Sequence, residues 1–276
     1  MRVARASSAL IAAALASACF CSMVRAEQSV KLTAAFRPER LGAPSAIFVG
    51  FRITSTPPSS QVPVTNVTLQ LPEEMGIATS GLGLENCLAV RLDALGPKGC
   101  PADALMGRGA ATAEIPIAGE LISETAEVEL FSAPVIEGRL GLLVYVNAET
   151  PVFAQLIFPA SVIPADSPFG EGIDTSVPLV PSVPGAPDVA VTRFHMTLGA
   201  TRSGPGHFVY YRRRRGRRVA YEPDGLLLPS SCPRGGFPFQ ARFAFADGSS
   251  AAATTTVPCP RHSAQRRRLE GLTRLG

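Results

Sequence analysis

The chain has 276 residues, of which 46% are hydrophobic and 17% charged, so it can bury a core sufficient for one large or two ordinary domains. Glycine and proline contribute 25 residues each, which excludes a protein of long helices and favours short strands joined by many turns. The net charge of +4 hides an asymmetry, because residues 27–200 hold 9 basic and 18 acidic side chains, whereas residues 201–276 hold 14 and 4. The basic end is therefore expected to meet an anionic surface or the acidic part of the same chain.

Residues 1–26 have the pattern of an export signal peptide, with two arginines near the start and a run of small apolar residues, Ala9–Val24. We therefore expect a secreted, extracellular protein that begins at Glu27. The alternative is a lipoprotein cleaved before Cys19 and anchored through it. After residue 26 no segment approaches the ~20 apolar residues that a spanning helix needs, so we expect no transmembrane segment once the signal is removed.

Three strands are expected in the first part of the mature chain, at Lys31–Arg37, Ala46–Thr54 and Val64–Leu71. The sequence around the last two reads PERLGAPSAIFVGFRITS and VPVTNVTLQLPEEMGIAT, and it resembles the immunoglobulin-like repeats of bacterial surface proteins. The resemblance implies a sandwich fold and a display or adhesive setting.

Four cysteines remain after the signal: Cys87, Cys100, Cys232 and Cys259. An even number in an exported chain predicts two disulfides, for which three pairings are possible. We favour Cys87–Cys100 and Cys232–Cys259, because neighbours in sequence lose the least entropy when they meet. A zinc site is disfavoured because the chain has no pair of cysteines separated by two residues and no histidine close to the cysteines.

A second resemblance covers more of the chain. The segments NCLAVRLDALGPKGCPADALMGRGAATAEIPI, PFGEGIDTSVPLVPSVPGAPDVAV and CPRGGFPFQARFAFADGS are similar to uncharacterised secreted proteins of actinobacteria. The shared pattern is a cysteine, a Cys-Pro pair and a Gly-x-Gly motif, here Cys87, Cys100-Pro101 and Gly107-x-Gly109. The resemblance implies secretion and carries no established activity.

Further strands are expected after residue 109, at Ala110–Ile115, Ala126–Phe131, Arg139–Asn147, Val152–Phe158 and Val189–Leu198. Between the last two, Pro159–Pro187 is rich in proline and is expected to form an extended edge crossing or a long loop. His207–Arg212 and Arg218–Tyr221 predict a hairpin that turns at Arg215-Gly216.

A second hairpin is predicted near the end of the chain. Its first strand has an apolar face made of Phe237, Phe239, Ala241, Phe243 and Phe245, which recur at every second position. Asp247-Gly248 supplies the turn, and a β-branched return strand follows. Cys232 and Cys259 bracket the whole unit.

These elements predict an all-β, disulfide-stabilised protein made of two immunoglobulin-like β-sandwich domains, at residues 27–108 and 109–260. The alternative is one elongated sandwich. Residues 261–276 form a basic tail that we expect to be disordered.

The strongest candidate for a binding site is the basic run on the first hairpin: Arg212, Arg213, Arg214, Arg215, Arg217 and Arg218, flanked by Tyr210, Tyr211 and Tyr221. Arginines neutralise a polyanion and tyrosines stack on its groups, so this surface is expected to contact an anionic envelope polymer or a lipid surface. Export makes nucleic acid an unexpected partner. The alternative is a solvated hairpin tip whose charges prevent aggregation of an edge.

Catalytic motifs are scarce. A serine-histidine-aspartate site would have to use His195, His207 or His262, and the chain has no G-x-S-x-G elbow. No catalytic residue, cofactor or metal site is therefore expected. The sequence favours a non-catalytic extracellular or cell-envelope interaction protein, with a secreted hydrolase or a purely structural surface protein as the alternatives.

Overall fold

The computed structural model describes residues 27–56, 61–77, 81–117, 120–150, 153–181 and 188–260. The expected signal peptide, with Cys19, and the expected basic tail at 261–276 lie outside the described residues. In chain order the elements are β1 (Glu27–Arg37), β2 (Pro44–Thr56), β3 (Val64–Pro72), α1 (Ala89–Leu95), the 3₁₀ turns η1 (Gly96–Gly99) and η2 (Ala102–Ala104), β4 (Leu105–Ile117), β5 (Glu120–Ile136), β6 (Arg139–Ala148), β7 (Ala154–Pro164), β8 (Phe169–Ser176), β9 (Ala190–Leu198), β10 (Tyr210–Arg214), β11 (Arg217–Tyr221), β12 (Leu226–Leu227), β13 (Phe237–Phe245) and β14 (Ser250–Val257). The all-β expectation is confirmed.

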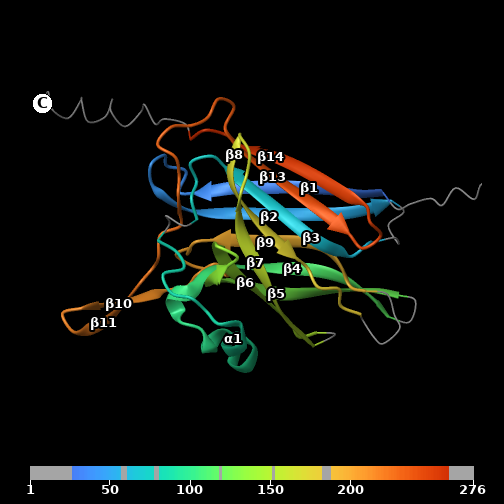
Figure 1. Ribbon diagram of the computed structural model, residues 1–276, viewed down its shortest axis with the longest axis horizontal. Coiled ribbons are helices and arrows are strands. Elements are labelled where there is room, and N and C mark those ends of the chain that lie inside the picture. Colours follow the sequence, from blue (N-terminus) through green and yellow to red (C-terminus); the bar gives the residue numbers. More distant parts are fainter. Residues whose placement is uncertain are drawn as a thin grey trace, which may run out of the picture.

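Twelve strands form one antiparallel sheet, in the order β1-β2-β9-β4-β5-β6-β7-β8-β3-β13-β14, with the short β12 paired to the start of β2. The two ends of this order, β1 and β14, lie side by side, so the sheet nearly closes on itself (Figure 1). The apolar faces of the strands point into the enclosed space, and the core lies there. β10 and β11 form a separate two-stranded hairpin.

This single sheet differs from the expected pair of immunoglobulin-like sandwiches. The expected boundary between residues 108 and 109 falls inside β4. Strands from the two expected domains also pair directly: Gly50 of β2 lies opposite His195 of β9, and Val67 of β3 lies opposite Phe243 of β13. Neither half can bury its apolar face alone, because its neighbours in the sheet come from the other half.

The phenylalanine-faced hairpin is formed as predicted. Phe237, Phe239, Phe243 and Phe245 of β13 are all buried. Phe36 of β1 meets the ring of Phe237 edge-on, with ring centroids 5.3 Å apart, and so joins the two ends of the sheet. Gly248, at φ +79°, makes the turn at the end of β13. The predicted Cys232–Cys259 disulfide holds the two ends of the hairpin together.

One end of the enclosed space is closed by the segment that precedes β4. The predicted Cys87–Cys100 disulfide brackets α1 in this segment, and Leu92 of α1 is fully buried. The backbone N–H of Cys87 donates to the carbonyl of Ser132 on β5, at 2.8 Å, which fixes the segment to the sheet. None of the helices in the described ranges is long and apolar enough to span a membrane.

Several elements were not predicted, among them β8 and α1. β8 lies within the proline-rich segment that was expected to be a crossing or a loop, yet it pairs with both β3 and β7. The helix α1 is short, and of its residues only Leu92 is buried, so its sequence carries no helical stripe of apolar residues.

Candidate functional site

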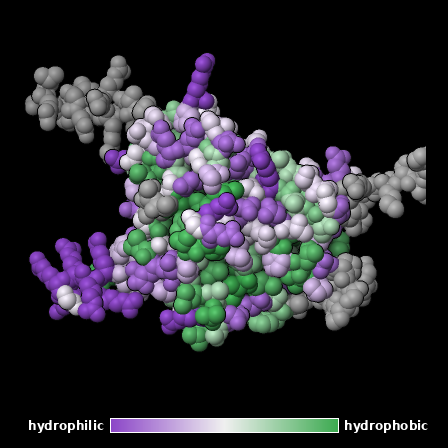
Figure 2. All heavy atoms as spheres, in the orientation of Figure 1, coloured by the Kyte–Doolittle hydropathy of each residue, from purple (hydrophilic) through white to green (hydrophobic). Residues whose placement is uncertain are grey.

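The β10–β11 hairpin projects from the body of the protein and carries the predicted basic run (Figure 1). Arg212 lies opposite Val219, Arg213 opposite Arg218 and Arg214 opposite Arg217. The turn falls at Arg215 and Gly216, as predicted, with φ of +50° and +77°. The six arginines are all exposed, and Figure 2 shows them as a hydrophilic projection beside the more mixed surface of the body. They form the surface that we call the basic hairpin.

Two tyrosines hold arginine side chains of the basic hairpin in place. The guanidinium of Arg218 lies 3.9 Å from the ring centre of Tyr211, and that of Arg212 lies 4.9 Å from the ring centre of Tyr221. Both distances fall within the range of cation–π contacts. A guanidinium stacked by one face keeps its N–H groups directed outward in the ring plane, where they remain available to an anion.

Tyr210, which was expected to be part of the binding surface, is instead fully buried. Its hydroxyl donates to the carbonyl of Leu105 at 2.6 Å and accepts from the backbone N–H of Gly83 at 2.9 Å. Burial raises the pKa of Tyr210 to about 12, against the lowering effect of the Gly83 hydrogen bond. The residue therefore anchors the base of the hairpin and cannot stack on a ligand.

The charge of the basic hairpin is not neutralised by the part of the chain that the structure describes. The ion pairs found there are Arg108–Glu129 and the contact of His207 with Glu222, and neither involves an arginine of the hairpin. Asp103, an acidic residue at the base of the hairpin, accepts instead from the backbone N–H of Tyr211, at 3.1 Å. Six guanidinium groups thus share a narrow, solvated projection without a carboxylate partner.

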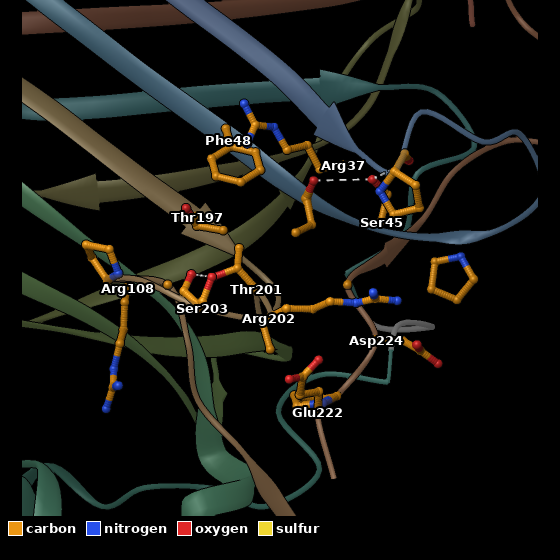
Figure 3. Close-up of a pocket in the computed structure, with 18 of the residues that line it drawn as sticks. Arg37, Ser45, Phe48, Arg108, Thr197, Thr201, Arg202, Ser203, Glu222 and Asp224 are labelled. Atoms are coloured by element: carbon orange, nitrogen blue, oxygen red, sulfur yellow. Dashed lines mark hydrogen bonds between the residues drawn. The ribbon is translucent and has the colours of Figure 1, made fainter.

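A groove of about 900 Å³ lies beside the hairpin, on the outer face of β2, β9 and β4. Its walls come from four separate stretches: the end of β1, the start of β2, the loop before β10 and the residues that follow β11. Figure 3 shows Arg37, Arg108 and Arg202 among the lining side chains, together with Glu222 and Asp224 from the stretch that follows β11. The groove therefore mixes both signs of charge.

Two of the three groove arginines are already engaged. Arg108 contacts the Glu129 carboxylate with its Nε at 2.7 Å and donates from Nη1 to the carbonyl of His207 at 2.8 Å. Burial raises the pKa of Glu129, and the adjacent Arg108 opposes this effect by favouring the charged carboxylate. The guanidinium of Arg37 lies over the ring of Phe48, 5.1 Å from its centre. Arg202 is thus the groove arginine with the fewest contacts to the groove wall.

One histidine that catalysis would need lines the groove and a second follows the lining residue Gly206, but they are not in a catalytic arrangement. His195 lines the groove from β9, and His207 places its Nδ1 2.9 Å from the carbonyl oxygen of Thr201. Within the described ranges, no serine or threonine hydroxyl is hydrogen-bonded to either imidazole, so no hydroxyl is activated in the manner of a nucleophile. His262 lies outside the described residues.

No group of three or more histidine, cysteine or acidic side chains in the described part of the chain could hold a metal ion. Comparison with protein-family models, with curated proteins and with solved structures found no match. The function is therefore inferred from the geometry of the chain itself.

Sequence reasoning identified the basic hairpin but missed the groove. Arg37, Arg108 and Arg202 are isolated in the sequence and come together only because β1, β4 and the loop before β10 meet on one face. No local pattern marks them. The Arg-rich run, in contrast, is visible in sequence because a hairpin places neighbours in sequence side by side in space.

Proposed function

We propose that the protein is a secreted, non-catalytic binding protein of the extracellular space or cell envelope, and that the basic hairpin holds it on an anionic envelope polymer or lipid surface. The observation that carries this proposal is the set of six exposed guanidinium groups with no carboxylate within ion-pair distance in the described chain. Arginine side chains bind phosphate and carboxylate groups through paired N–H donors, which suits a ligand with many repeated anionic groups.

An extracellular location is supported by independent features. Two disulfides are typical of a protein that folds in an oxidising compartment. Residues 1–26 have the composition of a signal peptide, and the resemblance to secreted actinobacterial proteins agrees with it.

The decisive experiment compares two triple variants that change the net charge equally. One is Arg213→Gln, Arg214→Gln, Arg215→Gln on the hairpin, and the other is Arg266→Gln, Arg267→Gln, Arg268→Gln in the C-terminal tail. Binding to vesicles of phosphatidylglycerol, to vesicles of phosphatidylcholine and to immobilised polyphosphate is measured by co-sedimentation at several salt concentrations.

The native protein is expected to bind the phosphatidylglycerol vesicles or the polyphosphate. It should not bind the phosphatidylcholine vesicles. The hairpin variant should lose at least about tenfold in affinity, and the slope of log affinity against log salt should fall by about 3, one for each anionic contact removed. The tail variant should retain the native affinity. Equal losses in both variants would show a nonspecific effect of net charge, and binding of neither anion by the native protein would contradict the proposal.

A further inference from the structure

The space enclosed by the sheet is not completely filled. A cavity of about 190 Å³ lies in its middle and is lined only by apolar side chains, among them Phe51, Val144 and Phe194. These three side chains point inward and yet are only partly buried, because part of their surface faces the cavity. Protein interiors are normally packed without voids of this size, so the cavity is a distinct feature of the fold.

A second cavity, of about 120 Å³, continues the first toward the start of β5. The two share lining residues, including Val64, Ala111 and Val146. Along β5 the lining extends from Leu130 to Glu124, which at a rise of about 3.4 Å per residue is roughly 20 Å. We call the two together the interior channel. Its small volume over this length gives it a narrow cross-section, which fits a single unbranched chain and not a fused ring system.

The composition of the lining explains why the channel stays open. Ala111 and Ala113 of β4, Ala126 of β5, Ala148 of β6 and Ala154 of β7 all line the second cavity. Five methyl groups stand where a filled core would carry larger aliphatic side chains, and strand pairing keeps the backbones too far apart to collapse onto them. An apolar cavity of this kind excludes water and accepts apolar guests.

Among the described residues that line this apolar channel, one has a polar side chain, Glu124. Glu124 follows the inward alternation of Ala126, Val128 and Leu130 on β5, is 5% exposed, and lines the second cavity. Its Oε1 is buried and has no hydrogen-bond partner. Because a buried carboxyl oxygen without a donor is costly, the site is incomplete without a group that donates to it.

We propose that the interior channel binds a single aliphatic chain whose polar end is a hydrogen-bond donor, an amine or an alcohol, placed at Glu124. The chain replaces missing core atoms along β4, β5 and β6, and its head group donates to the unpartnered Oε1. A fatty acid is disfavoured, because its carboxylate would face the carboxyl group of Glu124. This site is separate from the basic hairpin and does not depend on the function proposed for it.

The test titrates the native protein with dodecylamine, dodecanol and dodecanoic acid by calorimetry, with native mass spectrometry to count bound molecules. We expect one bound molecule of amine or alcohol and at least about tenfold weaker binding of the acid, the size of effect that one hydrogen bond to a carboxylate supports. Glu124→Leu should remove the preference, so that the acid binds as well as the alcohol. Ala111→Phe should fill the channel and abolish binding of all three.

Two further measurements keep the test decisive. If Ala111→Phe does not fold, Ala113→Leu adds a smaller side chain to the same wall. It should weaken the binding of dodecylamine, dodecanol and dodecanoic acid by similar factors. The native protein should also unfold at a higher temperature when saturated with dodecanol. Failure of the native protein to bind any chain overturns the proposal, as does a head-group preference that survives in Glu124→Leu. Unchanged binding in both alanine variants would place the bound chain outside the interior channel.

Discussion

Replacing Tyr210 by phenylalanine removes a buried hydroxyl that joins two distant segments. The hydroxyl donates to the buried Leu105 carbonyl and accepts from the partly buried Gly83 N–H, so Tyr210→Phe leaves both backbone groups without this partner. At about 1–2 kcal/mol for each lost bond, the variant should be less stable than the native protein by about 2–4 kcal/mol at neutral pH. The ring itself is kept, so the packing against Phe208 and Tyr221 is retained.

The same hydroxyl gives this stability difference a dependence on pH. Burial raises the pKa of Tyr210 to about 12, whereas the unfolded chain titrates near 10. The folded form holds its proton longer, so this contribution to stability is complete below pH 10 and is lost as the pH rises toward 12. At pH 11 the native protein should have lost about 1.4 kcal/mol through this group. Tyr210→Phe has no hydroxyl at this position to titrate, so its stability does not fall in this way. The difference in free energy of unfolding between the two proteins should therefore be about 1.4 kcal/mol smaller at pH 11 than at pH 8.

Urea unfolding at pH 8 and pH 11, followed by circular dichroism, gives the required free energies. Burial also raises the pKa of Tyr145 and of Tyr221, but both residues are present in the two proteins and their effects cancel in the difference. Tyr211→Phe is the matched control, because Tyr211 is exposed and should change the stability by less than about 0.5 kcal/mol at either pH. An equal gap at pH 8 and pH 11 would refute the assignment of the buried titrating group to Tyr210.

Two other substitutions test the groove. Gly225→Ala would drive a methyl group into the carbonyl oxygen of Ser45, so it should destabilise the protein by about 3 kcal/mol or more, whereas Gly81→Ala, with open space around it, should be nearly neutral in thermal unfolding. Arg108→Gln leaves the partly buried Glu129 carboxylate without its cation, so the pKa of Glu129 should rise further. The loss of stability should then be larger at pH 7 than at pH 4, where the carboxyl takes up a proton, and equal losses at both pH values would contradict the pairing.

The strands were predictable where one face is buried and the other exposed. β13 is the clearest example, since alternate phenylalanines and an Asp-Gly turn define both its inner face and its end. β8 was hidden because it follows Pro164 and Pro168 closely and contains Gly170 and Gly172, residues that usually mark a loop. Its pairing with β3 and β7 supplies the stability that its own sequence does not indicate.

The domain boundary was beyond local reasoning for a related reason. The expected boundary between residues 108 and 109 lies within the Gly107-x-Gly109 motif, and a local sequence pattern does not say which strands will be neighbours. In the structure these two glycines allow close packing, because a side chain at either position would overlap the backbone of β9. The expected boundary between two domains is therefore where two strands far apart in the sequence come together.

The groove beside the basic hairpin and the interior channel use different parts of the same strand, β4. On β4, Arg108 lies in the groove beside the hairpin and Ala113 lies in the wall of the channel near Glu124, a separation of five residues or about 17 Å. Arg108 faces outward and Ala113 faces inward, so the sheet itself separates the charged surface from the apolar one. Because the arginines of the hairpin are exposed and their field is screened at physiological salt, attachment through the hairpin should leave the affinity for an aliphatic chain unchanged. A protein held on an anionic surface by one end can then carry an apolar guest within its sheet.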